Sequence, residues 1–272
     1  MKRDLSIVLM LASSLLLNTG HAFLFPGGVK RAAASRLAVV YHPFPKPSPH
    51  GWEALPTTNG LWTKERMLRD IKRLKKMNVS ITLLVLTPER FSSSSPYLSE
   101  DCQTFTQLCE AEGITVSPMI SATTVISKRD QSLISQFIRD VWVQNDTGTE
   151  RPDRALCFLA GEAVTWRVRD PAIQYVNVPA SDAGASVVIN NQTWLFTAVP
   201  GKTEPAPSAR DREKSLKAGL NAVSKRSVPV AVLCLNAWND YGGSHVVEPN
   251  TFDGDTLYDR LSTWAGKYIS KP

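Results

Sequence analysis

The sequence predicts an α/β fold and, within that class, a (β/α)8 barrel of the TIM type. Short, strongly apolar runs alternate along the chain with longer segments of helical periodicity, which is typical of βα units built around a buried parallel sheet. Without its first 22 residues, which have the pattern of a signal peptide, the chain has about 250 residues, close to the usual size of one such barrel. An open, doubly wound sheet is the competing arrangement.

The individual elements follow from their periodicity. Apolar runs predict up to eight strands, at residues 36–44, 80–87, 114–122, 155–160, 173–178, 186–189, 193–199 and from 228 onward. Helical spacing predicts fewer than eight helices, at residues 63–77, 99–113, 127–145, 208–225 and 257–268. No convincing helix occurs between residues 162 and 191, so the middle units of the barrel are expected to be degenerate.

The first 22 residues have the pattern of a secretory signal peptide. Lys2 and Arg3 precede an apolar run, residues 5–17, that is too short to span a bilayer, and small residues follow for cleavage after Ala22. An uncleaved anchor is the alternative. We therefore expect a signal peptide over residues 1–22, a linker over 23–35 and a single barrel domain over 36–272. The protein would be secreted or periplasmic, without a stable membrane span after cleavage.

Charge and cysteine content exclude some classes of function. The net charge of +6 is modest, and its clearest source is one helix, residues 64–76. A one-sided basic helix is more often a solvated outer face than a nucleic-acid site, so nucleic-acid binding is not expected. The four cysteines show no CxxC pair and no Cys/His cluster with ligand spacing, which predicts buried thiols and leaves a distant disulfide open. We expect a monomer with neither a metal nor an organic cofactor.

Candidate functional residues gather where the first and last predicted strands end. The active face of a barrel is built at the carboxyl ends of its strands, and the first and last strands are neighbours in a closed barrel. One pocket should therefore contain the residues that follow these two ends, which we predict as catalytic Asp240, His245 and Glu248 and as substrate-binding Tyr41, His42, Trp52, Trp238, Asn239 and Tyr241. Aromatic faces beside carboxylates and amides suit a sugar ligand.

Each of these residues has a plainer explanation. Asp240, before Tyr-Gly-Gly, could be a turn residue, and His42, beside a proline, could be a structural histidine. Trp52 and Trp62 could fill the core instead of covering a ligand. Glu248, before Pro249, could anchor its loop rather than take part in a reaction.

The stretch W-N-D-Y-G-G-S-H-V-V-E-P, residues 238–249, resembles the last-strand motif of the barrels of glycoside hydrolase families 71 and 99. The sequence Y-H-P-F, residues 41–44, is similar to the first-strand motif of the same barrels, and Pro200-Gly201 matches a pair that often follows their penultimate strand. The resemblance is specific at the last strand, moderate at the first and weak between them.

The resemblance implies a secreted or periplasmic (β/α)8 protein acting on α-mannosides or α-glucans. The family's paired carboxylates lie three residues apart in that motif, one acting as base towards the sugar 2-hydroxyl and the other as general acid. The first of these falls on Asp240, where the family has Glu, and the second on Gly243. Because glycine has no proton to donate, and losing a general acid costs about 10²–10⁴-fold in rate, Gly243 separates two functions.

In the first function, His245 or Glu248 replaces the missing acid, and the chain is a divergent glycoside hydrolase with Asp240 as its base. In the second, the barrel keeps a sugar-shaped cleft without the chemistry. It then serves as a carbohydrate-binding or polysaccharide-assembly accessory protein, as is expected when functional sites vary on a common fold. In either case an oligosaccharide or polysaccharide is the expected partner.

Overall fold

The structure is a computed structural model of the 272-residue chain. It describes residues 34–44, 62–92, 99–143, 155–178, 186–197, 208–225, 230–235, 238–240, 245–250, 252 and 254–269. Contacts divide the chain into two units, Met1–Arg31 and Ala32–Pro272, and every described residue belongs to the second. The predicted signal peptide over residues 1–22 and the predicted linker up to residue 33 lie outside the described residues.

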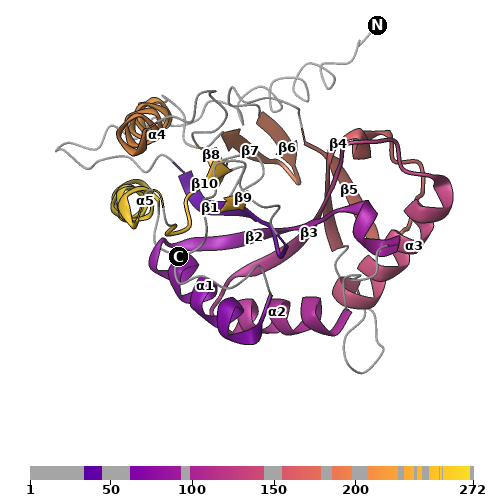
Figure 1. Cartoon of the computed structure of the whole chain (residues 1–272). Helices are drawn as coiled ribbons and strands as arrows, with labels where there is room; N and C mark the ends of the chain where they lie inside the picture. The colour runs from indigo at the N-terminus through magenta and orange to yellow at the C-terminus, as the bar shows by residue number, and fades with distance from the viewer. Residues whose placement is uncertain are drawn as a thin grey trace, which may run out of the picture. The chain divides into compact units, whose positions relative to one another are not determined.

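Eight strands form one sheet whose order is that of a TIM barrel (Figure 1). The strands are β1 Ala34–Tyr41, β2 Val79–Leu86, β3 Thr115–Ala122, β4 Ala155–Gly161, β5 Ile173–Asn177, β6 Ser186–Ile189, β7 Gln192–Thr197 and β8 Val230–Leu235. Their order is β5-β4-β3-β2-β1-β8-β7-β6, so the first strand pairs with both the second and the last. The predicted (β/α)8 barrel is confirmed, and the doubly wound alternative is excluded by this order.

The inside of the barrel is filled by alternate residues of the strands. Ala38 and Val40 of β1 face the same interior cluster as Phe158 of β4 and Trp194 of β7, with the last two ring centroids 5.1 Å apart. Because β4 and β7 are not neighbours in the sheet, their rings can meet only across the barrel. The interior is therefore a packed core, as it is in TIM barrels generally.

Strand β6 departs from the all-parallel pattern. It pairs antiparallel with β7, whereas every other pair in the sheet is parallel. The two strands are joined by Asn190 and Asn191, both with positive φ (48° and 61°), which is the geometry of a type I′ hairpin turn. The side chain of Gln174 on β5 donates to Asn190 Oδ1 at 3.3 Å, so a side-chain hydrogen bond links the two edges of the nearly closed sheet.

Five α-helices and three short helical turns are described. The α-helices are α1 Lys64–Lys76, α2 Ser99–Ala111, α3 Lys128–Ile138, α4 Ala209–Ser224 and α5 Thr256–Tyr268; the turns are η1 Pro88–Ser92, η2 Arg139–Val143 and η3 Glu162–Thr165. Helices α1, α3 and α4 begin where the sequence predicted, because the hydroxyls of Thr63, Ser127 and Ser208 each accept from the backbone N–H three residues on. None of the described helices has both the length and the hydropathy needed to cross a membrane.

The connection from β4 to β5 contains η3 where a regular barrel has an α-helix, as the sequence predicted for the middle units. Helix α3 and the turn η2 that follows it each hold this connection with one side chain. Gln131 Oε1 accepts from the backbone N–H groups of Arg167 and Val168, at 2.8 and 3.2 Å. Arg139 Nη1 contacts Asp170 Oδ1 at 3.1 Å. These polar contacts from α3 and η2 thus stabilise this part of the barrel wall.

The prediction for the cysteines is confirmed. All four are buried free thiols, and burial raises the pKa of each thiol well above its ordinary range. A buried thiol with a raised pKa is a poor nucleophile, so these side chains contribute to packing rather than to chemistry.

Candidate functional site

The ends of β1 and β8 meet as the sequence predicted. The backbone N–H of Trp238 donates to Val40 O at 2.6 Å. The side chain of Asn239 then pairs with the backbone of His42, with Oδ1 accepting from the N–H at 2.7 Å and Nδ2 donating to the carbonyl at 2.8 Å. Asn239 is fully buried, so its amide extends the β1–β8 pairing by one residue and locks the two strand ends together. Its predicted contact with a ligand stays a prediction.

Asp240 lies in a short hairpin directly beyond this junction. Strand β9, Asn239–Asp240, pairs antiparallel with β10, His245–Val246, and the register places His245 opposite Asp240. Directly opposed residues are the nearest neighbours across an antiparallel pair. The two residues that the sequence assigned as base and substitute acid are therefore backbone partners. Residues 241–244, which include Tyr241 and Gly243, lie outside the described residues.

Helix α1 beneath this hairpin divides its basic residues between two faces. Its lysines, Lys64, Lys72, Lys75 and Lys76, are exposed, which agrees with the predicted solvated face. Arg66 is buried, and its Nε lies 3.6 Å from Asp70 Oδ2. Arg69 Nη2 lies 3.1 Å from Asp70 Oδ1 and 3.4 Å from Glu248 Oε1. The guanidinium group suits this shared contact because its planar fork presents several donors at once.

Glu248 links the segment that follows the β9–β10 hairpin to α1. Its carboxyl is fully buried beside Arg69, and its backbone N–H donates to Trp238 O at 3.0 Å. Asn250 Nδ2 donates to the Glu248 carbonyl, also at 3.0 Å. Of the two roles that the sequence left open for Glu248, this position favours the anchor over the catalyst.

The protonation of Glu248 follows from its surroundings. Burial, and then the negative charge of Asp70, raises the pKa of the Glu248 carboxyl from 4.5 to about 8. The positive charges of Arg66, Arg69 and Arg73 act in the opposite direction without reversing the shift. The carboxyl therefore holds its proton more tightly in the folded protein than in the unfolded chain.

Tyr41 points away from the barrel interior. It belongs to the core between the sheet and the helices, together with Leu37 and Val39, whereas Ala38 and Val40 face inward. Its hydroxyl donates to Asp70 Oδ2 at 2.9 Å and accepts from Trp62 Nε1 at 3.2 Å. Burial, and then the charge of Asp70, raises the pKa of Tyr41 well above its ordinary value. This fully buried position suits a structural contact with α1.

The two described tryptophans among the candidate residues, Trp62 and Trp238, are also buried. Trp62 is 7% exposed and packs against Phe105, which agrees with the plainer explanation that it fills the core. Trp238 has no exposed surface, and its ring meets that of Tyr258 on α5 edge-on at 6.1 Å. Trp238 contributes to the β1–β8 junction through its backbone N–H and not through its ring. Trp52 lies outside the described residues.

The residues at the mouth of the barrel are those that continue the inward-facing series of each strand. His42 follows Ala38 and Val40 on β1 and is half-buried, so among the predicted site residues whose side chains the structure describes it is the one that stays partly accessible. By the same alternation, Thr87 follows Val85, and Ser121 follows Met119. We did not identify these two hydroxyls from the sequence. Strand parity identifies them only once the register of the sheet is known, and the sequence does not display the register.

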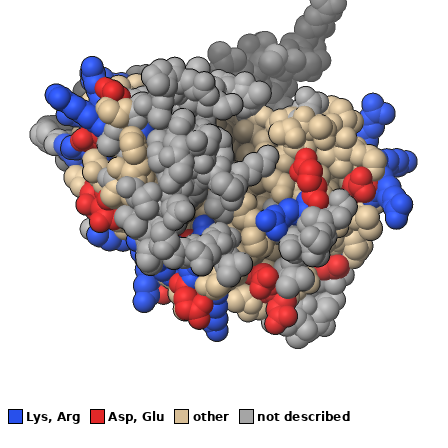
Figure 2. All heavy atoms as spheres, viewed as in Figure 1, with Lys and Arg blue, Asp and Glu red and all other residues tan. Residues whose placement is uncertain are grey.

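The described residues offer no single basic surface on the face seen in Figure 2 and no group of metal ligands. In the view of Figure 2, Lys and Arg side chains alternate with Asp and Glu around the margin of the face and do not gather into one basic surface. Within the ranges that the structure describes, no three His, Cys, Asp or Glu side chains are grouped so that they could hold a metal ion.

Comparison with known proteins shows the fold. No protein-family model matches the sequence, and no curated protein matches it either. Among solved structures, the chain is similar to the GH99 endo-α-mannosidase from Bacteroides thetaiotaomicron in complex with bis-tris propane, with a TM-score of 0.56 and 12% sequence identity, over 86% of this chain and 97% of that one. A second structure of the GH99 endo-α-mannosidase from the same organism gives a TM-score of 0.53 at the same identity and coverage. The chain thus has a TIM-type barrel fold that is also found in a glycoside hydrolase of family 99.

Proposed function

We propose that this chain is a carbohydrate-active protein that hydrolyses α-linked mannan- or glucan-type glycans, with Asp240 as base and His245 as general acid. The observation that carries the proposal is the β9–β10 register, which makes Asp240 and His245 direct partners at the carboxyl end of the last strand. In a TIM barrel this end of the strands is where active sites are built. An imidazole titrates near neutral pH, so it can supply the proton that Gly243 cannot.

Three independent features support a sugar as the ligand. The last-strand motif resembles that of family 99, and the fold is shared with a family 99 endo-α-mannosidase. At the mouth of the barrel, the half-buried imidazole of His42 lies on the same face as the hydroxyl-bearing residues Thr87 and Ser121, which are side chains that hydrogen-bond sugar hydroxyls.

A second candidate function, a carbohydrate-binding barrel without activity, is favoured by one specific observation. Glu248, which the sequence offered as a replacement acid, is buried against Arg69 and anchors its segment. Only His245 is then left as a substitute for the missing acid. If His245 does not act as one, Asp240 has no catalytic partner in the motif.

Hydrolysis and binding assays on residues 23–272 separate the two functions. We expect release of reducing ends from an α-mannan or an α-glucan, and a fall of about 10²–10⁴-fold in kcat/KM for both Asp240→Asn and His245→Gln. Glu110→Gln, a change to an exposed carboxylate on α2, is the matched control and should keep full activity. Saturable binding without any hydrolysis would assign the binding function, and equal activity of all three variants would reject the catalytic assignment.

We also propose that the protein is exported with cleavage after Ala22 and acts as a monomer. N-terminal sequencing of the exported protein should begin at Phe23, and light scattering coupled to gel filtration should give the mass of one chain. An N-terminus at Met1 on membrane-bound protein would instead support the uncleaved anchor.

A further inference from the structure

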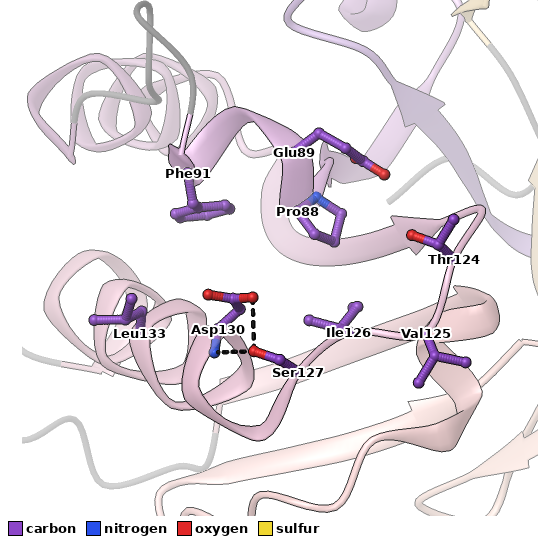
Figure 3. A pocket seen from close by; sticks show the side chains of 9 residues that line it. All are labelled: Pro88, Glu89, Phe91, Thr124, Val125, Ile126, Ser127, Asp130 and Leu133. Atoms are coloured by element: carbon purple, nitrogen blue, oxygen red, sulfur yellow. Dashed lines mark hydrogen bonds between the residues drawn. The ribbon is translucent and has the colours of Figure 1, made fainter.

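A pocket lies outside the β1–β8 junction, where the chain leaves β2 and β3. It has a volume of about 220 Å³ and lies between η1, which follows β2, and the segment that runs from the end of β3 into α3 (Figure 3). Pockets for drug-sized ligands begin at about 300 Å³, so this one is of the size for a single ring rather than a large cofactor. It opens at the same carboxyl ends of the strands at which TIM barrels build their sites.

The walls of the pocket are held in place by contacts behind them. The ring of Phe91 meets that of Phe137 edge-on at 5.1 Å, and the guanidinium of Arg90 lies 3.9 Å from the ring centroid of Phe44. On the opposite wall, Gln131 Nε2 donates to the carbonyl of Ile126 at 3.0 Å. A pocket fixed by such contacts is formed before a ligand arrives, which lowers the entropic cost of binding.

Part of the lining, on both walls of the pocket, is apolar and accessible. Val125 is 69% exposed and Leu133 is 55% exposed, and both are among the five large hydrophobic side chains that the described part of the chain leaves exposed. They lie with Pro88, Phe91 and Ile126 around the pocket (Figure 3). Apolar surface gathered in a concave site is typical of a ligand-binding position.

The rest of the described lining, again on both walls, consists of hydrogen-bonding groups. Glu89 and Asp130 contribute carboxylates, and Thr124 and Ser127 contribute hydroxyls. Ser127 Oγ donates to Asp130 Oδ2 at 2.7 Å, and in Figure 3 the Asp130 carboxylate points into the space opposite the Phe91 ring. Among the lining residues that the structure describes there is no lysine or arginine, so their chemistry disfavours a phosphate or another anion.

We propose that this pocket is a secondary carbohydrate site that holds one sugar unit of a glycan chain. A pyranose ring presents C–H groups to apolar and aromatic side chains and hydroxyl donors to carboxylates, and the walls of this pocket offer both kinds of group. The pocket lies two to three strands from β8 in the sheet order β3-β2-β1-β8, or about 10–15 Å at the usual spacing between strands. The inference rests on the proposed carbohydrate function and adds to it a second point of contact on the same glycan.

The test is methyl NMR on protein labelled at its Ile, Leu and Val methyl groups, titrated with α-linked mannotetraose and with maltotetraose. We expect saturable shifts of the Val125, Ile126 and Leu133 methyls with at least one of these sugars. Val125→Glu should weaken this binding at least tenfold, because it places a charged side chain over the apolar wall. Val188→Glu is the matched control, since Val188 is 68% exposed on β6, and it should leave the affinity within twofold.

The outcomes distinguish this inference from the proposed function. Asp240→Asn should leave the pocket shifts unchanged, because Asp240 follows β8 whereas the pocket lies at the ends of β2 and β3. Shifts confined to residues near His42, or equal affinities for the two glutamate variants, would overturn the pocket assignment and leave the proposed function in place. Shifts caused by tetramethylammonium but by neither sugar would show a cation site and overturn it as well. Absence of any sugar response would overturn both.

Discussion

Replacing Glu248 by Gln tests the electrostatics of the anchor. The folded protein holds the Glu248 proton up to about pH 8, whereas the unfolded chain releases it near pH 4.5. The stability that this proton contributes is fully present below pH 4.5 and is lost progressively as the pH rises to about 8, because the unfolded state binds fewer protons in that interval. Glutamine keeps the shape and cannot ionise, so the variant does not suffer this loss.

The size of the effect has an upper limit set by the two pKa values. At about 1.4 kcal/mol for each pH unit, the interval from 4.5 to about 8 corresponds to at most about 5 kcal/mol. The opposing charges of Arg66, Arg69 and Arg73 are already included in this limit. One fifth of it, about 1 kcal/mol, would still change Tm by about 2–4 °C in a domain of this size.

The assay is the Tm of Glu248→Gln minus the Tm of the unaltered protein, measured by calorimetry from pH 4 to pH 9. We expect this difference to rise with pH between 4.5 and 8 and to be level on either side. Glu112→Gln is the control, because Glu112 is a half-exposed partner of Lys75 and its removal should cost at most about 1 kcal/mol. A difference that falls with rising pH would show that the ion pair with Arg69 outweighs burial, and the reasoning would be refuted.

Three further predictions concern the barrel itself. Gly161→Ala should lower the free energy of unfolding in urea by at least about 2 kcal/mol, because Gly161 has a φ of 60° and a Cβ there would overlap the Ala122 carbonyl oxygen. Gly219→Ala is the control: this residue lies inside α4 with open space around it, so the change should be neutral or stabilising. Asn239→Ala should destabilise by about 2 kcal/mol or more and speed hydrogen exchange at the His42 amide; unchanged exchange would contradict the strand-end lock. A thiol reagent should label fewer than one cysteine in the native protein and four after denaturation, and rapid native labelling would contradict the burial of Cys102, Cys109, Cys157 and Cys234.

Much of the fold could be predicted from the sequence because the strands β1, β2, β3 and β8 are mostly buried on both faces and so read as apolar runs. The starts of three helices could also be predicted, because the N-cap hydroxyls of Thr63, Ser127 and Ser208 act on backbone groups only three residues away. The direction of β6 could not be predicted from apolar character alone. Its signal was the Asn190-Asn191 pair, because asparagine tolerates the positive φ that a two-residue hairpin turn requires.

The candidate site could be predicted from the sequence only in part. Topology predicted that His42 and Asn239 would be close, although they lie 197 residues apart. The direction of the Tyr41 ring depends on strand parity, and parity becomes readable only when the register is known. The contact between Arg69 and Glu248 spans 179 residues and leaves no local pattern in the sequence. Long-range pairing of buried charges is decided by packing that the sequence does not display.

The most direct test of the central claim is calorimetric titration of residues 23–272 with α-linked manno- and gluco-oligosaccharides. The proposed function predicts saturable binding of at least one of them with a Kd of about 1 mM or below, a free energy of about −4 kcal/mol or more favourable. Absence of binding to every such glycan at millimolar concentration would contradict both the glycoside hydrolase and the carbohydrate-binding protein.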